Sequence, residues 1–175
     1  MKIKERGAAL VVALLILVVV SLMGISAMKS SIFSAKVATG TQADAMTFEA
    51  AESALSAAYT EINGMPGAAL YASLGGGEPL YRCVTKGDTS KSGKCGANNS
   101  DKLDSRGLLM ATSATKLNGF EPIAGAEIGT SGGSQIMVDY RIAMLGESEM
   151  KSFNLSNHHL QEALKMGVKP GSEIQ

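Results

Sequence analysis

The sequence predicts an α+β protein in which one long N-terminal helix packs on a small sheet. Three observations lead to this fold class. Residues from Gly7 to Met28 are uncharged and mostly apolar, and a helical repeat of apolar residues follows as far as Asn63. Beyond Pro66 the chain changes to glycine-punctuated segments with one clear period-two strand. About 147 residues follow Met28, which is enough for one domain with its own core.

The uncharged block is long enough to cross a bilayer as a helix. It holds about 22 residues, which at a rise of about 1.5 Å per residue reach about 33 Å. The charges before it, Lys2, Lys4, Glu5 and Arg6, are net positive, so the N-terminus is expected to stay cytoplasmic. A secretory signal peptide shares these features, and 24–27 offers small residues for its cleavage. From this block alone, a retained anchor and a cleaved signal both remain open.

An amphipathic helix is expected to continue the apolar block. From Phe48 onward, apolar residues recur at the three-and-four spacing of one helical face. Gly64 and Pro66 then provide a stop signal. Gly24 and Gly40 are weak points, since each costs up to about 1 kcal/mol relative to alanine and allows a bend. The expected apolar face consists of Phe48, Ala51, Leu55, Ala58 or Tyr59, and Ile62.

Short strands and loops are expected beyond Pro66. A strand is predicted at 80–84, a polar turn region at 86–104 and an element of uncertain type at 107–115. The strongest strand pattern lies at 135–145, where apolar positions alternate along the chain. One face of that strand should pack on the amphipathic helix, and its residues are Ile136, Val138, Tyr140, Ile142 and Met144.

The C-terminal region is expected to form a short helix and a tail. Ser156 or Asn157 would cap this helix, and Gly167 with Pro170 would stop it. No closing strand is predicted in 146–175. The apolar residues of the predicted helix are Leu160, Ala163 and Leu164.

Charge balance and cysteine content limit the classes of function. The chain has 16 basic and 16 acidic residues, so it has no net field that would attract nucleic acid or anionic lipid. Its two cysteines, Cys83 and Cys95, lie in a region that the topology places outside the cytoplasm, where a disulfide is expected. Closing this loop contributes about 3 kcal/mol in the chain-entropy account.

Basic residues gather around the predicted disulfide loop. They outnumber the local acidic residues Asp88, Asp101 and Asp104 by six to three. Such a patch could contact DNA or an acidic partner, or dock a protein, but its only aromatic neighbour is Tyr81. Single-strand binders use several stacking aromatics, so a solvated surface is the favoured interpretation and DNA is an unlikely ligand. The six basic residues are Arg82, Lys86, Lys91, Lys94, Lys102 and Arg106.

The sequence lacks the spacings that mark common active sites. His158 and His159 are adjacent rather than four apart, and are interpreted as a solvated helix start. The oxygen-rich stretch 98–104 lacks the spacing of a calcium loop, and glycines 75–77 lack the lysine of a phosphate loop. No nucleophile is placed with a base. We therefore expect no enzyme, no metal and no cofactor.

Two N-terminal stretches carry a resemblance to a known family. RGAALVVALLIL begins at Arg6, and FEAAE occupies 48–52. In this order, after a basic preface, they resemble the N-terminal region of the PilX family of type IV pilus minor pilins. The resemblance covers about residues 4–59 and implies a pilin-like fold, with an antiparallel sheet in the head.

The resemblance also implies how the N-terminus is processed. In this family a prepilin peptidase cuts after a glycine and methylates the new N-terminus, which here places the cut between Gly7 and Ala8 and the methyl group on Ala8. A glycine suits the cut because it lets the backbone approach the protease closely. The expected organisation is a prepilin leader at 1–7, a transmembrane and pilus-core segment at 8–28, an amphipathic continuation at 29–63 and a periplasmic head at 64–175.

Val12 is the fifth residue of the expected mature chain. Most pilin-like subunits have a glutamate there, which is thought to pair with the N-terminal ammonium of the neighbour above. A subunit with no neighbour above has no use for a buried carboxylate, which would cost several kcal/mol or become protonated. The absence of glutamate thus fits the tip-most subunit, although Val12 alone would also suit a plain membrane helix.

These implications give the expected function of a minor pilin that primes type IV pilus assembly and joins the tip complex. It would support twitching motility, adhesion or DNA uptake. Its expected partners are other minor pilins, a PilY-family tip adhesin, the major pilin and the prepilin peptidase. It would reside in the bacterial inner membrane and then at the pilus tip. The alternatives are a GspK-like pseudopilin of type II secretion, and a secreted binding domain released after cleavage near Ala27.

Overall fold

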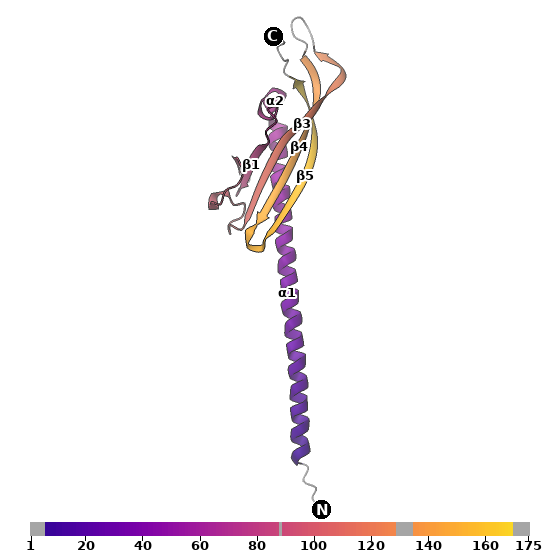
Figure 1. Cartoon of the computed structure of the whole chain (residues 1–175), viewed down its shortest axis with the longest axis vertical. Helices are drawn as coiled ribbons and strands as arrows, with labels where there is room; N and C mark the ends of the chain where they lie inside the picture. Colours follow the sequence, from indigo (N-terminus) through magenta and orange to yellow (C-terminus); the bar gives the residue numbers. More distant parts are fainter. Residues whose placement is uncertain (1–5, 88, 129–134, 170–175) are drawn as a thin grey trace, which may run out of the picture. The chain divides into compact units, whose positions relative to one another are not determined.

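The computed structural model describes residues 6–87, 89–128 and 135–169. Two α-helices, five strands and two short 3-10 turns make up this part of the chain (Figure 1). In chain order they are α1 (Arg6–Gly64), α2 (Gly67–Leu74), β1 (Leu80–Thr85), β2 (Thr89–Ser92), η1 (Asn99–Asp101), β3 (Leu109–Ile128), β4 (Gln135–Met150), η2 (Lys151–Phe153) and β5 (Leu155–Lys169). The predicted α+β class is confirmed.

The chain divides into two compact units, of which the first ends at Gln42 and the second begins at Ala43. In the first unit α1 is continuous through Gly24 and Gly40, so neither glycine interrupts the helix. The hydroxyls of Ser21, Ser26, Thr39 and Thr41 bond back to carbonyl oxygens four residues earlier, as in Ser21 Oγ to Leu17 O at 2.7 Å. This pattern satisfies polar side chains inside the helix, as an apolar environment requires.

The second unit, which we call the head, contains the remainder of α1 packed on one face of the sheet. Ala51, Leu55, Ala58 and Ile62 are buried there, which confirms most of the predicted apolar face. Phe48 was expected in the same face but is 48% exposed. The buried face is instead extended by small residues, because α1 approaches the sheet too closely for larger ones. These residues are Ala43, Thr47, Ala50 and Ala54.

Gly146 on β4 shows how close this approach is. A Cβ added there would lie 2.4 Å from the carbonyl oxygen of Ala51 and 2.9 Å from Cγ of Leu55. Only glycine fits where β4 passes the backbone of α1. A residue of α1 as large as Phe48 therefore lies at the border of the interface, where its ring packs against the ring of His159 with centroids 4.3 Å apart.

The sheet is antiparallel, with strand order β2-β1-β3-β4-β5. The predicted strand at 80–84 is confirmed as β1, and 135–145 is confirmed as part of β4. The element of uncertain type at 107–115 forms the start of β3, and the predicted turn region at 86–104 also contains β2 and η1. The expected inner face of β4 is confirmed in the fully buried Val138, Tyr140, Ile142 and Met144, while the side chain of Ile136 lies outside the described part.

The prediction of a C-terminal helix is wrong, because 155–169 form strand β5, paired with β4 from Met150↔Leu155 to Ile136↔Lys169. Leu160, Ala163 and Leu164 would form one stripe of a helix. In the strand, Leu160 and Leu164 point away from α1, whereas Ala163 packs against the hydrophobic core between α1 and the sheet. A closing strand thus exists where none was expected, and its backbone groups are satisfied by β4.

Candidate functional site

Gly7 and Ala8, the predicted processing site, lie in the first turn of α1, and Val12 lies about one turn further on. Within the described residues, one helix is long and apolar enough to cross a membrane, with a mean hydropathy of 3.1 in its most apolar window. Ala8 and Val12 are both exposed in the isolated chain. Such a segment is available for insertion in a bilayer or for packing against other apolar helices.

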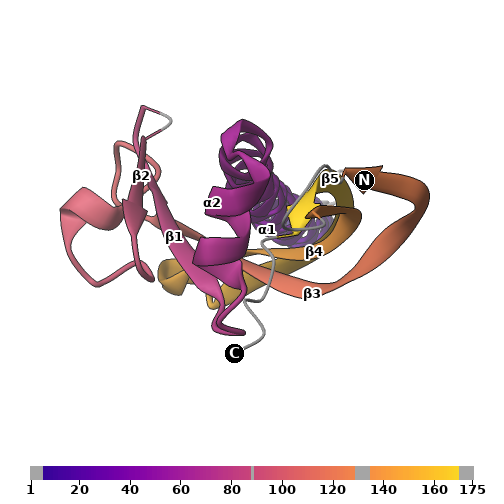
Figure 2. The same ribbon diagram turned by 90° about the horizontal axis from the view of Figure 1, so that it is seen from above.

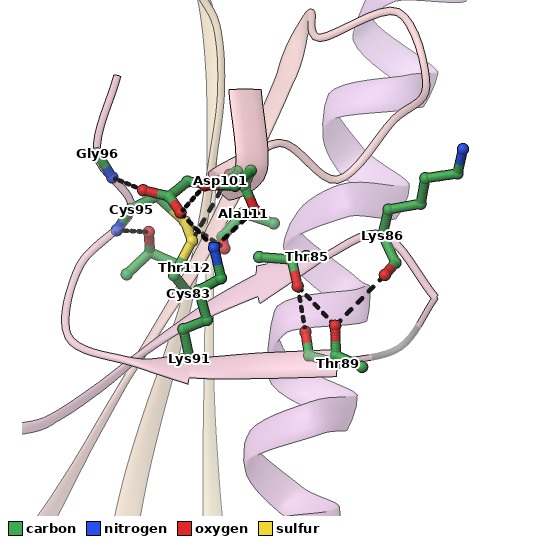
Figure 3. A network of polar contacts seen from close by, with 11 residues as sticks. Cys83, Thr85, Lys86, Thr89, Lys91, Cys95, Gly96, Asp101, Ala111 and Thr112 are labelled. Atoms are coloured by element: carbon green, nitrogen blue, oxygen red, sulfur yellow. Dashed lines mark hydrogen bonds and ion pairs between the residues drawn. A yellow bond between two sulfur atoms is a disulfide. The ribbon is translucent and has the colours of Figure 1, made fainter. Parts of the chain in front are cut away.

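Cys83 on β1 is joined by a disulfide to Cys95 in the following loop, with Cα atoms 4.8 Å apart (Figure 3). Cys83 is buried and Cys95 is half-buried. The side chain of Cys83 lies on the opposite side of β1 from that of Val84, which packs against α1 in the core. The disulfide therefore holds the loop over the face of the sheet that points away from α1.

Asp101 organises the disulfide loop. Its carboxylate accepts hydrogen bonds from Lys91 Nζ at 2.8 Å and from the backbone N–H of Gly96 at 3.0 Å (Figure 3). The bond from Lys91, with help from Gly96, lowers the pKa of Asp101 below its usual value. The carboxylate thus serves the loop's own structure.

Asp104 organises the turn into β3. Its carboxylate accepts hydrogen bonds from the backbone N–H groups of Leu108 at 2.8 Å, Leu109 at 2.9 Å and Arg106 at 3.2 Å. Burial by itself raises the pKa of Asp104, but the bonds from these N–H groups outweigh it and leave the pKa lowered. Asp104 is therefore a local structural anchor.

Three of the six predicted patch residues have a carboxylate or aromatic partner within the head. The Nε and Nη2 atoms of Arg82 donate three hydrogen bonds to the carboxylate of Glu61 on α1, the shortest at 2.7 Å, and this hydrogen bonding raises the pKa of Arg82. Lys91 is paired with Asp101, and the Nζ of Lys94 lies 4.4 Å from the centre of the Tyr81 ring. The structure therefore divides the predicted patch, because half of its cations already have partners within the head.

The other three predicted patch residues are Lys86, Lys102 and Arg106. Lys86 and Arg106 are exposed, and Lys102 is half-buried. In the described part of the chain, none of the three takes part in an ion pair. They are the cations of this region that remain available to an acidic partner.

An open groove of about 290 Å³ lies beside Cys95 on the face of the sheet that points away from α1. Its walls include Lys94, Thr112, Glu147, Glu149 and His158. His158 Nδ1 lies 3.6 Å from Glu147 Oε1 on the neighbouring strand. No cluster of three potential metal-ligating residues occurs in the described residues. The groove can accept a polar or charged side chain.

The polar links between α1 and β5 were missed by sequence reasoning. His158 and His159 do not start a helix, because they lie within strand β5. As consecutive residues of a strand they point to opposite faces of the sheet. Asn157 Nδ2 donates to Thr47 Oγ1 at 2.8 Å, and Nδ1 of His159 contacts the carboxylate of Glu52. The available signal was the polar residues Asn157, His159, Gln161 and Lys165 at alternate positions, interrupted by Ala163.

Lys165 makes the strongest of these links. Its ammonium group donates hydrogen bonds to the carbonyl oxygens of Ile62, Asn63 and Met65, where α1 ends, and the bond to Asn63 measures 2.8 Å. The last carbonyl groups of a helix have no partner within it, and the helix dipole favours a positive charge there. Lys165 therefore caps α1 from the sheet.

The fold and this N-terminal segment define a pilin-like α+β protein, in which a long apolar helix continues into the core of a five-stranded head. Residues 6–56 match the family model described as PilX N-terminal, a match that lies within α1. No curated protein and no solved structure gave a significant match to the chain. Residues 6–56 are therefore similar to the N-terminal region of PilX-family pilins, which confirms the resemblance seen in the sequence over this segment.

Proposed function

We propose that this protein is a minor pilin that primes type IV pilus assembly and forms part of the tip complex. The observation that carries the proposal is the PilX N-terminal match at 6–56, on a helix with no charge from Gly7 to Met28. The match runs through the alternative signal cleavage site near Ala27. This continuity supports retention of the helix over its removal with a signal peptide.

Processing is proposed to occur between Gly7 and Ala8, with methylation of Ala8. The mature helix first anchors the subunit in the inner membrane with the head in the periplasm. On assembly, its apolar segment at 8–28 exchanges lipid contacts for contacts with equivalent helices. Serine hydroxyls bonded within the helix, such as Ser21 and Ser26, suit both environments.

The proposed place at the tip depends on Val12. A glutamate at this depth must find a cation or become protonated, because a lone carboxylate in an apolar bundle costs several kcal/mol. Valine avoids this cost in the one subunit that has no neighbour above it. Tip location in turn brings the head into contact with other minor pilins, a PilY-family adhesin and the major pilin below.

The test of this proposal is Val12→Glu, with Val12→Gln to separate charge from size. For a tip subunit the new carboxylate finds no ammonium, so we expect fewer surface pili at equal expression and processing. The measurement is the number of pili per cell, together with labelling of this subunit. Normal piliation with the subunit labelled along the shaft would contradict the tip assignment.

A role in DNA uptake depends on the three available cations, Lys86, Lys102 and Arg106. If they contact DNA phosphates, a triple glutamine variant should reduce DNA uptake and leave pilus number unchanged. Replacing Lys91, whose charge is already paired with Asp101, is the matched control. Equal uptake by the wild type and the triple variant would exclude this role.

A further inference from the structure

The chain contains two Asn-Gly pairs, Asn63-Gly64 and Asn118-Gly119, in different backbone settings. An asparagine followed by glycine is chemically labile, because the backbone nitrogen of the glycine can attack the side-chain amide carbon of the asparagine. Glycine favours this attack since it has no Cβ to obstruct the ring that forms. In a folded protein the reaction also requires that the peptide between the two residues can rotate.

The peptide between Asn63 and Gly64 is held at both of its polar groups. Its N–H lies in the last turn of α1, where it donates a hydrogen bond within the helix. Its carbonyl oxygen, which belongs to Asn63, accepts a hydrogen bond from Lys165 Nζ at 2.8 Å. Rotation of this peptide would break both bonds, so the folded helix protects this pair.

The peptide between Asn118 and Gly119 lies at an interruption of the strand pairing. The register of β3 against β4 shifts between Leu117 and Gly119, so Asn118 between them is a bulged residue without a partner in the described pairing. A bulge bends its strand, and Figure 2 shows β3 curved beside β4. Gly119 has a φ of 150°, in a region that favours glycine. This pair therefore lies outside the regular hydrogen-bond ladder.

The side chain of Asn118 is accessible to water. Asn118 is exposed, and apart from chain neighbours no atom of the described residues lies within 4 Å of the place where a Cβ of Gly119 would be. Nδ2 of Asn118 donates a hydrogen bond to Oε1 of Glu162 on β5 at 3.2 Å. Water competes for both groups at this exposed position, and the bond joins side chains rather than the peptide.

We propose that Asn118 is a site of spontaneous deamidation in the folded head. The backbone nitrogen of Gly119 bonds to Cγ of Asn118, and the bond from Cγ to Nδ2 breaks. The side-chain nitrogen leaves as ammonia, which carries the proton lost from the Gly119 nitrogen, and a five-membered succinimide ring remains. Water then opens the ring, with its hydroxyl on either carbonyl carbon and its proton on the ring nitrogen. The products are aspartate and isoaspartate, and water is the co-reactant.

Deamidation replaces an attraction between β3 and β5 by a repulsion. The amide of Asn118 donates to Glu162, and in both products a carboxylate takes the place of this amide. Exposed like charges repel weakly, but isoaspartate also adds a methylene group to the backbone of β3. We expect the pairing of β3 with β4 to loosen from Gly119 onward while the rest of the head stays folded. This chemistry does not depend on the proposed function, because it takes place within the head.

Timed peptide mapping of the full chain tests this proposal. The chain is purified in detergent micelles, kept at neutral pH and physiological temperature, and sampled over weeks for the mass increase that accompanies conversion of an amide to a carboxylate. Trypsin separates the two pairs, because fragment 117–141 contains Asn118 and fragment 37–82 contains Asn63, each as its one asparagine. A sample digested at once gives the background, and methylation by an isoaspartyl methyltransferase identifies the isoaspartate product.

We expect conversion at Asn118 to be at least about tenfold faster than at Asn63, because opening one hydrogen bond to a charged group raises the barrier by about that factor. In denaturant both peptides can rotate, so the two rates should become similar. Asn118→Gln should abolish conversion in its fragment, since the longer side chain would have to form a larger ring. Asn63→Gln is the matched control and should leave conversion at Asn118 unchanged.

Two results would overturn the assignment of Asn118. One is an unmodified fragment 117–141 in the folded chain after the denatured chain has converted, which would mean that the bulge protects the pair as the helix does. The other is a rate at Asn118 no higher than that at Asn63, which would mean that the backbone setting does not select between the two pairs.

Discussion

Replacing Lys165 tests whether β5 caps the C-terminal end of α1. Lys165→Met keeps the length of the side chain but removes the charge and the three hydrogen bonds to Ile62, Asn63 and Met65. A charged hydrogen bond contributes about 1.5 to 3 kcal/mol, and a cation at a helix C-terminus about 0.3 to 2 kcal/mol. These terms overlap, so we expect a loss of about 2 to 3 kcal/mol.

For a unit of this size, that loss corresponds to a fall in Tm of about 6 to 12 °C. The assay is thermal unfolding of the full chain in detergent micelles, followed by circular dichroism of the β signal. Lys116→Met is the matched control, because Lys116 is an exposed lysine on β3 and its loss should change Tm by less than about 2 °C. A Tm of Lys165→Met within about 2 °C of the wild type would refute the capping role and the register of β5.

Three further predictions concern the head. Gly146→Ala should cost about 1 to 3 kcal/mol, because its Cβ meets the backbone of α1, while Gly76→Ala, with nothing within 4 Å, should be nearly neutral in the same melts. Protein isolated without reductant should show no alkylation of Cys83 or Cys95, and modification of both would exclude the disulfide. Because the pKa of Asp104 is lowered by folding, its contribution is complete above about pH 4 and is lost as pH falls through the lowered pKa. Asp104→Asn should therefore reduce stability at pH 7 and reduce its loss in acid, and melts with the same pH dependence as the wild type would contradict this role.

The sequence was sufficient to predict those helices and strands whose pattern of apolar residues has one interpretation. The helix of 59 residues could be predicted because its apolar block and its later three-and-four repeat agree, and because Gly64 and Pro66 mark its end. The inner face of β4 could be predicted because four alternating apolar residues are buried against α1. In both cases the apolar residues are the ones that face the core.

Strand β5 could not be predicted because its polarity is reversed. Asn157, His159 and Lys165 face the helix, and Leu160 and Leu164 face solvent, so the apolar residues give no core-facing repeat of period two. The spacing of Leu160, Ala163 and Leu164 imitates a helical stripe instead. Tertiary hydrogen bonds to α1 and pairing with β4 decide the structure, and neither is visible in local sequence.

In the candidate site, too, some features could be predicted from the sequence and others could not. The proximity of Cys83 and Cys95 followed from their being the chain's two cysteines, in a region placed outside the cytoplasm. The patch of six basic residues was counted correctly, but Arg82 is held by Glu61, a residue 21 positions earlier on α1. Charge counting along a loop cannot reveal partners that come from another element.

The central claim is that the N-terminal helix is retained as the core segment of a pilus subunit. Mass spectrometry of intact protein and its N-terminal peptide, from pili sheared off the cell surface, tests this most directly. The account predicts a mature chain that begins at Ala8 and carries one added methyl group. A mature chain that begins at Met28, or a full-length precursor in the sheared material, would contradict it.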